Sequence, residues 1–367
     1  MRVLVVNAGS SSLKLSLMER DRALSAESIS APEERLDTPR LERFIRSVGE
    51  VEAVGHRIVH GGTEFTGPTL IDDRVRNRLV ALTDLAPLHQ PKSLLALDSV
   101  TAIIPDRPAV ACFDTAFHST IPEYAATYAL PAEWRRRWPL RRFGFHGLSH
   151  AYVSRRAAEL IGRPTGSLRI VSCHLGAGAS VAAIDAGRSV DTTMGFTPLE
   201  GLVMATRSGT VDPGLLLWLE QHAGMTSAEL ASNLEHRSGL LGLGGSSDLK
   251  SLLEAEHRGD PDASLAVGVY LHRLRSLVGS MAAAMNGLDV LAFTGGVGER
   301  SAPIRQRTAD GLGFLGVAVS PKINSDLRSD SDISSEGARV RTVVVEAGED
   351  VEIAAQVERL LTSTGLA

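Results

Sequence analysis

The sequence predicts an α/β protein with two duplicated domains, each a mixed sheet flanked by helices. Strand-like and helical segments alternate along the chain, which is typical of α/β folds. A pair of strands around a turn of small residues occurs twice, near the N-terminus and again near the middle of the chain. The length of 367 residues, with 43% hydrophobic residues, also exceeds what one small core requires.

Each copy of the repeated pattern predicts a hairpin. Apolar or alternating residues form the strands, and Gly, Ala and Ser form the turns. The strand, turn and strand segments are residues 3–6, 7–12 and 13–17 in the first copy, and 170–174, 176–180 and 181–184 in the second. Two such copies indicate that one domain was duplicated.

Periodicity places further elements along the chain. A third glycine-rich turn, residues 295–299, follows a buried-strand pattern at 290–294. Other strands are expected at 53–59, 109–113 and 342–345, and helices at 150–161, 213–222, 263–285, from 304 onward and at 351–361. Two segments rich in Pro or charge, 31–40 and 322–335, are interpreted as surface loops. The basic run 135–142 is interpreted as solvated surface rather than an anion site.

Composition narrows the classes of partner. The formal net charge is −5 and no long block of like charge occurs, which argues against nucleic acid or a membrane surface as partner. The first apolar run ends at Asn7, too short for a signal peptide or membrane span, so we expect a cytoplasmic protein. Cys112 and Cys173 lie in apolar runs and are interpreted as reduced core residues.

The three turns of small residues suggest a polyphosphate ligand. Backbone N–H groups in such turns can approach phosphate oxygens closely, and hydroxyl groups add donors. None of these three turns matches a P-loop motif or the dinucleotide-binding G-x-G-x-x-G motif. One turn alone is more often a simple hairpin, but three at strand ends together favour phosphate binding.

Four polar residues in small or aromatic surroundings are candidates for chemistry. Arg57 lies in a strand that leads to a double glycine, and Arg207 lies among small residues; an arginine fork matches carboxylate or phosphoryl oxygens. Asp114 directly follows an apolar strand, where active-site carboxylates of α/β folds often lie. His146 is flanked by Gly and Phe. Each residue also has an ordinary structural alternative. The arginines could form ion pairs, Asp114 could be a helix N-cap, and His146 could be a core histidine.

Five separated segments closely resemble the acetate kinase family: residues 7–14, 56–62, 113–118, 143–149 and 194–201. The resemblance implies ATP- and Mg²⁺-dependent, reversible phosphoryl transfer that converts acetate to acetyl phosphate and ATP to ADP. It also implies two ribonuclease-H-like domains of the actin-like ATPase kind, usually assembled as a homodimer. We expect one domain at 1–115 plus 350–367, and at 116–349 a second with the nucleotide site and dimer interface.

The resemblance also implies roles for individual residues. Arg57 and Arg207 would hold the carboxylate and the transferring phosphoryl group, and His146 and Arg207 would stabilise the transition state. Asp114, Asn7 and Glu349 would surround Mg²⁺, or Mn²⁺ in its place. The methyl pocket would consist of Val59, Leu88, Phe145 and Pro198. The nucleotide would be bound by Ser10, Ser12, Lys14, His174, Leu175, Gly176, Ala177, Gly178, Asp248, Leu249, Lys250, Gly296, Val297, Gly298, Glu299 and Arg300.

The sequence departs from the family pattern mainly on the nucleotide side. Ala177 stands where the family usually has asparagine, Lys250 where it has arginine, and Arg300 where it has asparagine. These changes leave the phosphoryl donor open. Three other functions also stay open: the same reaction on propionate or butyrate, an alcohol or sugar kinase of the same fold, and a non-catalytic nucleotide sensor.

Overall fold

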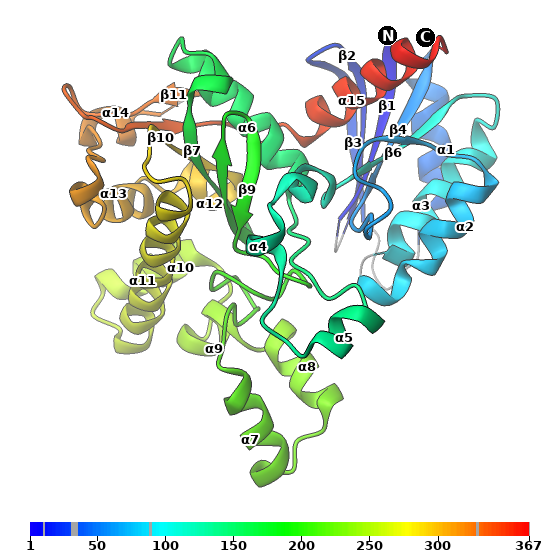
Figure 1. Cartoon of the computed structure of the whole chain (residues 1–367). Helices are drawn as coiled ribbons and strands as arrows, with labels where there is room; N and C mark the ends of the chain where they lie inside the picture. The colour runs from blue at the N-terminus through cyan, green and yellow to red at the C-terminus, as the bar shows by residue number, and fades with distance from the viewer. Residues whose placement is uncertain (10–11, 31–35, 88–89, 328–329, 367) are drawn as a thin grey trace. The chain divides into compact units, whose positions relative to one another are not determined.

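The chain folds into two compact units (Figure 1). The computed structural model describes residues 1–9, 12–30, 36–87, 90–327 and 330–366. Unit 1 comprises Met1–Ser119, Phe145–Tyr152 and Gly348–Ala367, and unit 2 comprises Thr120–Gly144 and Val153–Ala347. The expected boundaries placed residues 145–152 in the second domain. They group with unit 1 because Leu148 is part of that unit's hydrophobic core.

Unit 1 contains a mixed six-stranded sheet in the order β3-β2-β1-β4-β6-β5. The strands are β1 (Arg2–Ala8), β2 (Ser12–Glu19), β3 (Arg22–Ser30), β4 (Ala53–Ile58), β5 (Thr69–Leu70) and β6 (Ala109–Phe113). β1, β2 and β3 pair antiparallel, β1, β4 and β6 pair parallel, and β5 adds an antiparallel edge. Because β1, β4 and β6 are parallel neighbours, their carboxyl ends lie side by side at the same end of the strands.

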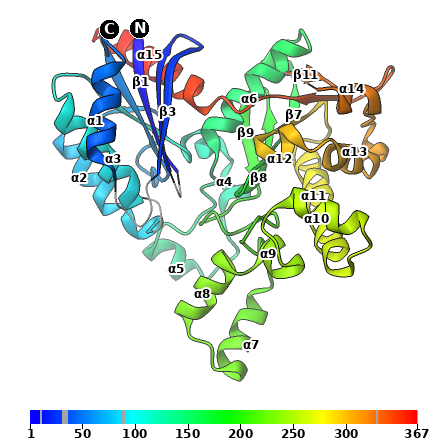
Figure 2. The same cartoon turned by 180° about the vertical axis from the view of Figure 1, so that it is seen from behind.

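Helices cover both faces of the unit 1 sheet because alternate strand residues point to opposite sides. Val3 and Val5 of β1 pack with α15 (Glu349–Thr364), whereas Leu4 and Val6 pack with α1 (Thr38–Ser47) and α3 (Gln90–Ile103). Figure 2 shows α1 and α3 from behind. The unit also contains α2 (Asp73–Ala81), η2 (Thr83–Leu85), η3 (Ala116–Thr120) and the start of α6 (Gly147–Leu160).

Unit 2 repeats the unit 1 sheet. Its order is β11-β12-β10-β7-β8-β9, again with an antiparallel meander, parallel central strands and an antiparallel edge. The strands are β7 (Arg169–Leu175), β8 (Ala179–Asp185), β9 (Arg188–Thr192), β10 (Val290–Thr294), β11 (Ser331–Asp332) and β12 (Arg341–Val344). The identical pattern confirms the predicted α/β class and the duplication.

The helices of unit 2 vary widely in length. They are α4 (Glu123–Ala126), α5 (Ala132–Arg137), most of α6, η4 (Thr165–Ser167), α7 (Pro213–Ala223), α8 (Ser227–His236), α9 (Gly239–Gly244), α10 (Leu249–His257), α11 (Pro261–Ala284), α12 (Gly295–Arg300), α13 (Ala302–Asp310), η5 (Gly313–Leu315) and α14 (Pro321–Ser325). Among the described residues, no helix combines the length and apolar character that a bilayer span requires.

Three local predictions need correction. Residues 295–299 form helix α12 rather than a turn. Gly295 has φ +77°, and a Cβ there would lie 2.9 Å from the Leu175 backbone, so the glycine permits close approach to β7. The predicted loop 31–40 runs into α1 at Thr38, and 322–335 includes α14 and β11; residues 31–35 and 328–329 lie outside the described chain. Glycine and proline obscured these helices because both lower helix propensity.

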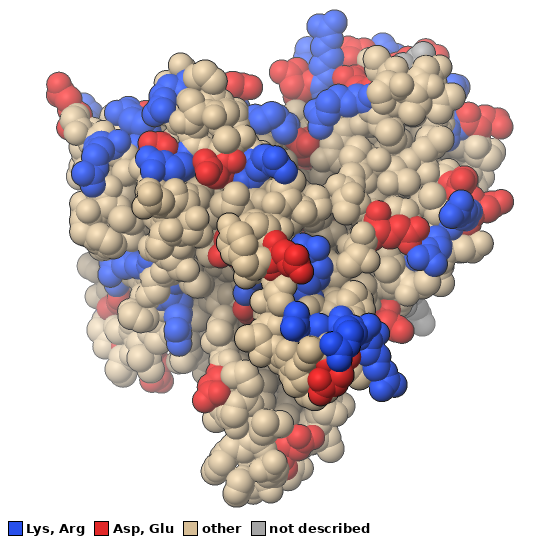
Figure 3. Space-filling model, in the orientation of Figure 1, with Lys and Arg blue, Asp and Glu red and all other residues tan. Residues whose placement is uncertain are grey.

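The surface carries charges of both signs, and the two cysteines lie in the core, as the sequence predicts. Figure 3 shows acidic and basic side chains intermixed on one face, with a basic group over α5, where Arg135, Arg136 and Arg137 are exposed. Cys112 and Cys173 are fully buried and form no disulfide, and burial raises the pKa of both thiols.

Candidate active site

The candidate catalytic residues of unit 1 meet at the carboxyl ends of three neighbouring parallel strands. Asn7 lies in β1, Arg57 in β4, and Asp114 directly follows β6. Arg57 Nε donates to Asp114 Oδ1 at 3.1 Å, and Nη2 donates to Oδ2 at 2.5 Å. Arg57 Nη1 donates to Asn7 Oδ1 at 3.1 Å, and Asn7 Nδ2 donates to Glu349 Oε2 at 3.0 Å. One hydrogen-bonded network therefore joins four predicted site residues.

Carboxyl groups outnumber cations in this network, so its charge favours the binding of a further cation. Burial disfavours the charged Arg57 guanidinium, but the carboxylates of Asp114, Glu349 and Asp350 outweigh it and raise the pKa of Arg57. Burial raises the pKa of Asp114, and the charge and hydrogen bonds of Arg57 oppose that rise. Burial also raises the pKa of Asp350, which accepts a 2.5 Å hydrogen bond from Ser16 Oγ. Three carboxyl groups thus lie around one guanidinium, and Lys14 is the other positive charge that acts on Asp350.

The oxygen donors of this cluster fit Mg²⁺ chemically. Mg²⁺ prefers oxygen ligands and is often held by one or two carboxylates together with substrate phosphates and water. In the described part of the chain, no group of three or more His, Cys, Asp or Glu residues could hold a metal ion alone. Asn7 and Glu349 therefore suit a metal that arrives with a phosphorylated substrate.

His146 is positioned by a constrained turn beside Asp114. Its φ is +57°, a left-handed conformation that is uncommon for residues other than glycine. Gly147 N donates to Asp114 O at 2.8 Å, and a Cβ on Gly147 would lie only 2.2 Å from that oxygen. Only glycine permits this contact. The tight turn ties half-buried His146 to the chain segment that carries Asp114.

Apolar candidate residues lie in both units. Val59 and Phe145 are buried in unit 1, where the Phe145 ring packs edge-on against His60 at 5.6 Å. His118 Nε2 lies 3.0 Å from Phe145 O. Burial lowers the pKa of His60 and of His118 to about 4, so both are neutral at pH 7. The other two residues of the predicted methyl pocket are Pro198, which belongs to unit 2, and Leu88, which lies outside the described residues.

A buried histidine, His56, precedes Arg57 in β4 and points to the other face of the sheet. His56 is 1% exposed, and neither ring nitrogen hydrogen-bonds to any described residue. Burial lowers the pKa of His56 to about 4, against a smaller opposing effect of Asp98. The unfolded chain, where histidine has a pKa near 6.5, therefore binds more protons than the folded chain as pH falls below 6.5. Stability contributed by this group is present above pH 6.5 and is lost as pH falls towards 4.

We expect His56→Leu to weaken this pH dependence. Between pH 7.5 and 5, the wild type should lose about 2 kcal/mol more unfolding free energy than the variant, because the variant has no imidazole to protonate on unfolding. Urea titrations at both pH values measure the difference. The exposed residue His272 provides a control, since His272→Leu should behave like the wild type. An equal pH loss in His56→Leu and wild type would contradict the prediction.

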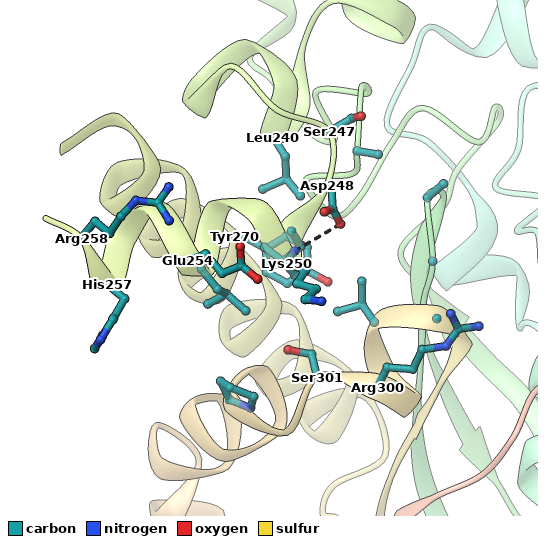
Figure 4. Close-up of a pocket in the computed structure, with 18 residues that line it drawn as sticks. Leu240, Ser247, Asp248, Lys250, Glu254, His257, Arg258, Tyr270, Arg300 and Ser301 are labelled. Carbon is teal, nitrogen blue, oxygen red and sulfur yellow. Dashed lines mark hydrogen bonds between the residues drawn. The ribbon is translucent and has the colours of Figure 1, made fainter. Parts of the chain in front are cut away.

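Unit 2 contains a cavity of about 920 Å³ that gathers predicted nucleotide residues from three distant segments (Figure 4). Its lining includes the hairpin turn at Gly176 and Ala177, the start of α10 and helix α12. The predicted residues in the lining are Gly176, Ala177, Asp248, Leu249, Lys250, Gly296, Val297 and Arg300. The volume lies in the range of cofactor-sized pockets.

The cavity combines apolar walls with charged side chains of both signs, namely Lys250, Arg258 and Arg300 against Asp248 and Glu254. Leu240, Leu249 and Tyr270 supply apolar surface, and the three cations give the lining a small excess of positive charge. Asp248 accepts backbone hydrogen bonds from Lys250 and Ser251 and so caps α10. This arrangement suits a ligand with a flat apolar part and a negatively charged part.

Other predicted nucleotide residues do not line the cavity. His174, Leu175, Gly178, Gly298 and Glu299 lie outside its lining. The Glu299 carboxylate instead accepts hydrogen bonds from Gly295 N and Ala347 N, both at 3.0 Å. In unit 1, Lys14 is exposed on β2 opposite Asn7, Ser12 begins the same strand, and Ser10 lies outside the described residues.

Arg207 lies in the loop between β9 and α7. Its side chain is half-buried, and burial lowers the pKa of the guanidinium. Nη1 donates to Pro198 O at 3.4 Å, so Arg207 and Pro198 lie together in unit 2. Gly239 backs the loop closely, because a Cβ there would lie 2.2 Å from Met204 O.

Sequence reasoning missed a second polar network beside this loop. Tyr128, Arg142 and Glu200 interact directly through short hydrogen bonds. Arg142 belongs to the basic run interpreted as solvated surface, but its side chain is only 17% exposed, so that interpretation is wrong at this residue. Glu200 lies inside the segment 194–201 that carried the family resemblance, which was the one available signal.

The chain thus combines a duplicated α/β fold, a cofactor-sized cavity in unit 2 and an arginine–carboxylate cluster in unit 1. The sequence profile of the acetokinase family matches residues 35–355, and the chain belongs to that family. It is 41% identical to acetate kinase of Geobacillus sp. (strain WCH70), covering 98% of both chains, and 40% identical to acetate kinase of Bacillus subtilis (strain 168), covering 98% and 99%.

Solved structures agree with this assignment. Acetate kinase from Porphyromonas gingivalis is 37% identical with a TM-score of 0.91, covering 98% of this chain and 99% of that one. A propionate kinase from Francisella tularensis subsp. tularensis SCHU S4 is 34% identical with a TM-score of 0.89, covering 97% and 98%. The family resemblance found in the sequence is thereby confirmed.

Proposed function

We propose that this chain is an acetate kinase that transfers the γ-phosphoryl group of ATP to acetate, reversibly and in line. Support comes from acetate kinases at 40% and 41% identity over nearly the whole chain. The observation that carries the proposal is the hydrogen-bonded network of Arg57, Asp114, Asn7 and Glu349. This network joins four residues predicted for acyl phosphate chemistry and contains both a guanidinium and carboxylates.

The chemistry requires no general base. A carboxylate such as acetate, with a pKa of about 4 to 5, is already ionised at neutral pH. A carboxylate oxygen forms the new P–O bond, and the bond between the γ-phosphorus and the bridging oxygen breaks, so ADP leaves with the electron pair. The remaining task is to align two anions and to balance the charge on the transferring group.

Arg57 is suited to bind one of these anions. A guanidinium carries five N–H groups, and three hydrogen bonds of Arg57 go to Asp114 and Asn7. The paired contact with Asp114 fixes the plane of the guanidinium, and the remaining N–H groups can donate to a substrate oxygen. Asp114 therefore orients Arg57 in this proposal, in addition to its proposed place beside the metal.

Mg²⁺ would be held by Asn7 and Glu349, with Asp114 nearby. The bound ion would neutralise charge on the phosphoryl oxygens as the bond to the leaving group breaks. Arg207 and His146 would stabilise the same charge from their own positions. Lys250 and Arg300, which line the unit 2 cavity, would take the negatively charged part of ATP.

A hydroxamate assay tests the function directly. Purified protein with Mg²⁺ receives acetate, propionate or butyrate, each with ATP, GTP or pyrophosphate, and hydroxylamine traps any acyl phosphate. We expect acetyl hydroxamate to form fastest with ATP. Faster reaction with propionate would instead support a propionate kinase, and one methylene changes binding by only about 1 kcal/mol. No acyl phosphate with any pair would contradict the proposal and favour a nucleotide sensor.

We also propose that the enzyme works in the cytoplasm as a homodimer that associates through α7. None of the residues of α7 is buried, and Leu215, Leu217 and Trp218 are 47%, 56% and 53% exposed. An exposed group of large apolar side chains is typical of an interaction surface. A second copy of the same patch would cover it in a two-fold dimer.

Trp218→Glu should separate the two subunits. A charge placed in an apolar interface loses its hydration, so the dimer should dissociate at micromolar concentration. Sedimentation velocity measures the change. Tyr124→Glu, at an 88% exposed position outside α7, is the control and should leave the dimer intact. A dimer that persists in Trp218→Glu would contradict α7 as the interface, and a monomeric wild type would contradict the dimer itself.

A further inference from the structure

A hydrogen-bonded network fastens the loop that carries Pro198. Tyr128 Oη donates to Glu200 Oε2 at 2.6 Å and accepts from Phe196 N at 2.9 Å. Arg142 Nη2 donates to Glu200 Oε1 at 2.9 Å. The Glu200 carboxylate therefore receives a phenol on one oxygen and a guanidinium on the other, and charge-assisted bonds of this kind are stronger than neutral ones.

The same network also forms hydrogen bonds with the backbone at the start of the loop. Arg142 Nη1 lies within hydrogen-bond distance of the carbonyl oxygens of Thr192, Thr193 and Met194, at 3.0, 3.2 and 3.2 Å. Gly195 O accepts from Phe143 N at 3.0 Å and from Gly144 N at 3.3 Å. Four consecutive carbonyl groups, from the last residue of β9 into the loop (residues 192–195), thus accept hydrogen bonds from the segment that carries Arg142.

Side chains pack so closely around Gly195 that no larger residue fits there. A Cβ at this position would lie 1.7 Å from Glu200 Oε2 and 2.1 Å from Tyr128 Oη. The two side chains therefore press directly on the glycine, and the loop cannot shift towards them. Tyr128 sits in this contact as a spacer as well as a hydrogen-bond donor.

The held loop carries Pro198, one of the residues predicted for the methyl pocket. Pro198 lies between the two fastened points, Phe196 and Glu200, and its carbonyl accepts from Arg207 Nη1 at 3.4 Å. The far end is also closed, because Gly201 N donates to Thr210 Oγ1 at 3.0 Å and Thr210 N donates to Gly201 O at 3.0 Å. The position of Pro198 thus depends on Tyr128 and Glu200.

We propose that Tyr128, Arg142 and Glu200 are positioning residues that hold Pro198 and Arg207 in place and thereby set the preference for a short acyl chain. This inference rests on the proposed function, because Pro198 and Arg207 matter only if an acyl group binds there. None of the three side chains is required to touch the substrate. Their effect passes through the loop backbone that they hold.

Tyr128→Phe tests the proposal with the smallest change. The variant keeps the ring but leaves Phe196 N and Glu200 without the hydroxyl, so the loop should loosen. We expect KM for acetate to rise about tenfold, the effect of losing one partly buried hydrogen bond to a charged group. KM for ATP should stay within about twofold, because Tyr128, Arg142 and Glu200 do not line the unit 2 cavity. The ratio of kcat/KM for acetate over propionate should fall.

Matched variants separate positioning from general destabilisation. Glu200→Gln retains an oxygen that can accept from Tyr128, so it should restore part of what Glu200→Ala loses. Tyr124→Phe makes the same chemical change at an 88% exposed tyrosine and should leave all constants unchanged. Thermal unfolding of each variant shows how much folded protein contributes to the rates.

Specific results would overturn the inference. Tyr128→Phe and Glu200→Ala could lower the melting temperature and leave the acetate KM and the acetate-to-propionate ratio at wild-type values; the network would then be structural only. An equal rise of the acetate and ATP KM values would also exclude a role confined to the acyl side. Wild-type protein that forms no acyl phosphate would instead contradict the proposed function, so the two failures are distinguishable.

Discussion

Arg207→Ala is expected to lower kcat by about 10²- to 10³-fold, the loss typical of removing one preorganised electrostatic partner of the transition state. Arg207 is half-buried, where a cation acts on nearby charge through a lower effective dielectric than in water. A residue that acts mainly in the transition state should lower kcat and kcat/KM by similar factors. The hydroxamate assay at saturating acetate and ATP measures the change.

Two comparisons make the Arg207 result interpretable. Arg207→Lys keeps the charge but not the planar fork, so it should recover only part of the rate. Arg237→Ala removes an exposed arginine at the end of α8 and should leave the rate unchanged. A near-normal rate in Arg207→Ala would remove this residue from the proposed mechanism.

Asp114→Asn should affect both activity and stability. The substitution keeps the shape of the side chain but leaves buried Arg57 without its ionised partner, and breaking a buried pair typically costs about 3–5 kcal/mol. We expect kcat to fall by about 10²-fold or more, because Arg57 loses its fixed orientation. The Mg²⁺ concentration for half-maximal activity should rise if Asp114 also lies beside the metal.

The chain offers a matched control in the Arg76–Asp98 pair. Arg76 donates to both oxygens of Asp98 at 2.7 and 2.6 Å, as Arg57 does to Asp114, but these two side chains are 40% and 41% exposed. Asp98→Asn should therefore cost no more than about 1 kcal/mol and leave kcat unchanged. Urea unfolding of both variants gives the comparison. Equal losses in the two variants would contradict the special role of the buried pair.

Local patterns were enough to predict the scaffold. The first hairpin follows from alternating apolar residues around a glycine and serine turn, and β1 and β2 pair with Asn7 opposite Lys14. The same pattern at β7 and β8 revealed the duplication, since a hairpin depends on neighbouring residues only. Residue 295 shows the limit of this approach. Glycine favours a turn locally, but contact with the end of β7 allows a helix to start there.

The site was predictable in its residue types but not in its contacts. Arg57 and Asp114 were both singled out, but their pairing depends on β4 and β6 lying parallel in register, with Ile58 opposite Phe113. Arg142 was misread because a run of arginines resembles a solvated surface. Its side chain is half-buried, and three backbone carbonyl groups some fifty residues later converge on it.

The sequence alone determined the α/β class, the duplication, the family and the residue types of the candidate site, because period, turn residues and motifs are local properties of the chain. Tertiary structure decided which charges are paired and how far each is shielded from water: Arg57 with Asp114, and, more exposed, Arg142 with Glu200. Burial and pairing depend on distant segments meeting in space. Desolvation and neighbouring charge then set the pKa and the geometry of each group, and neither can be inferred from local sequence.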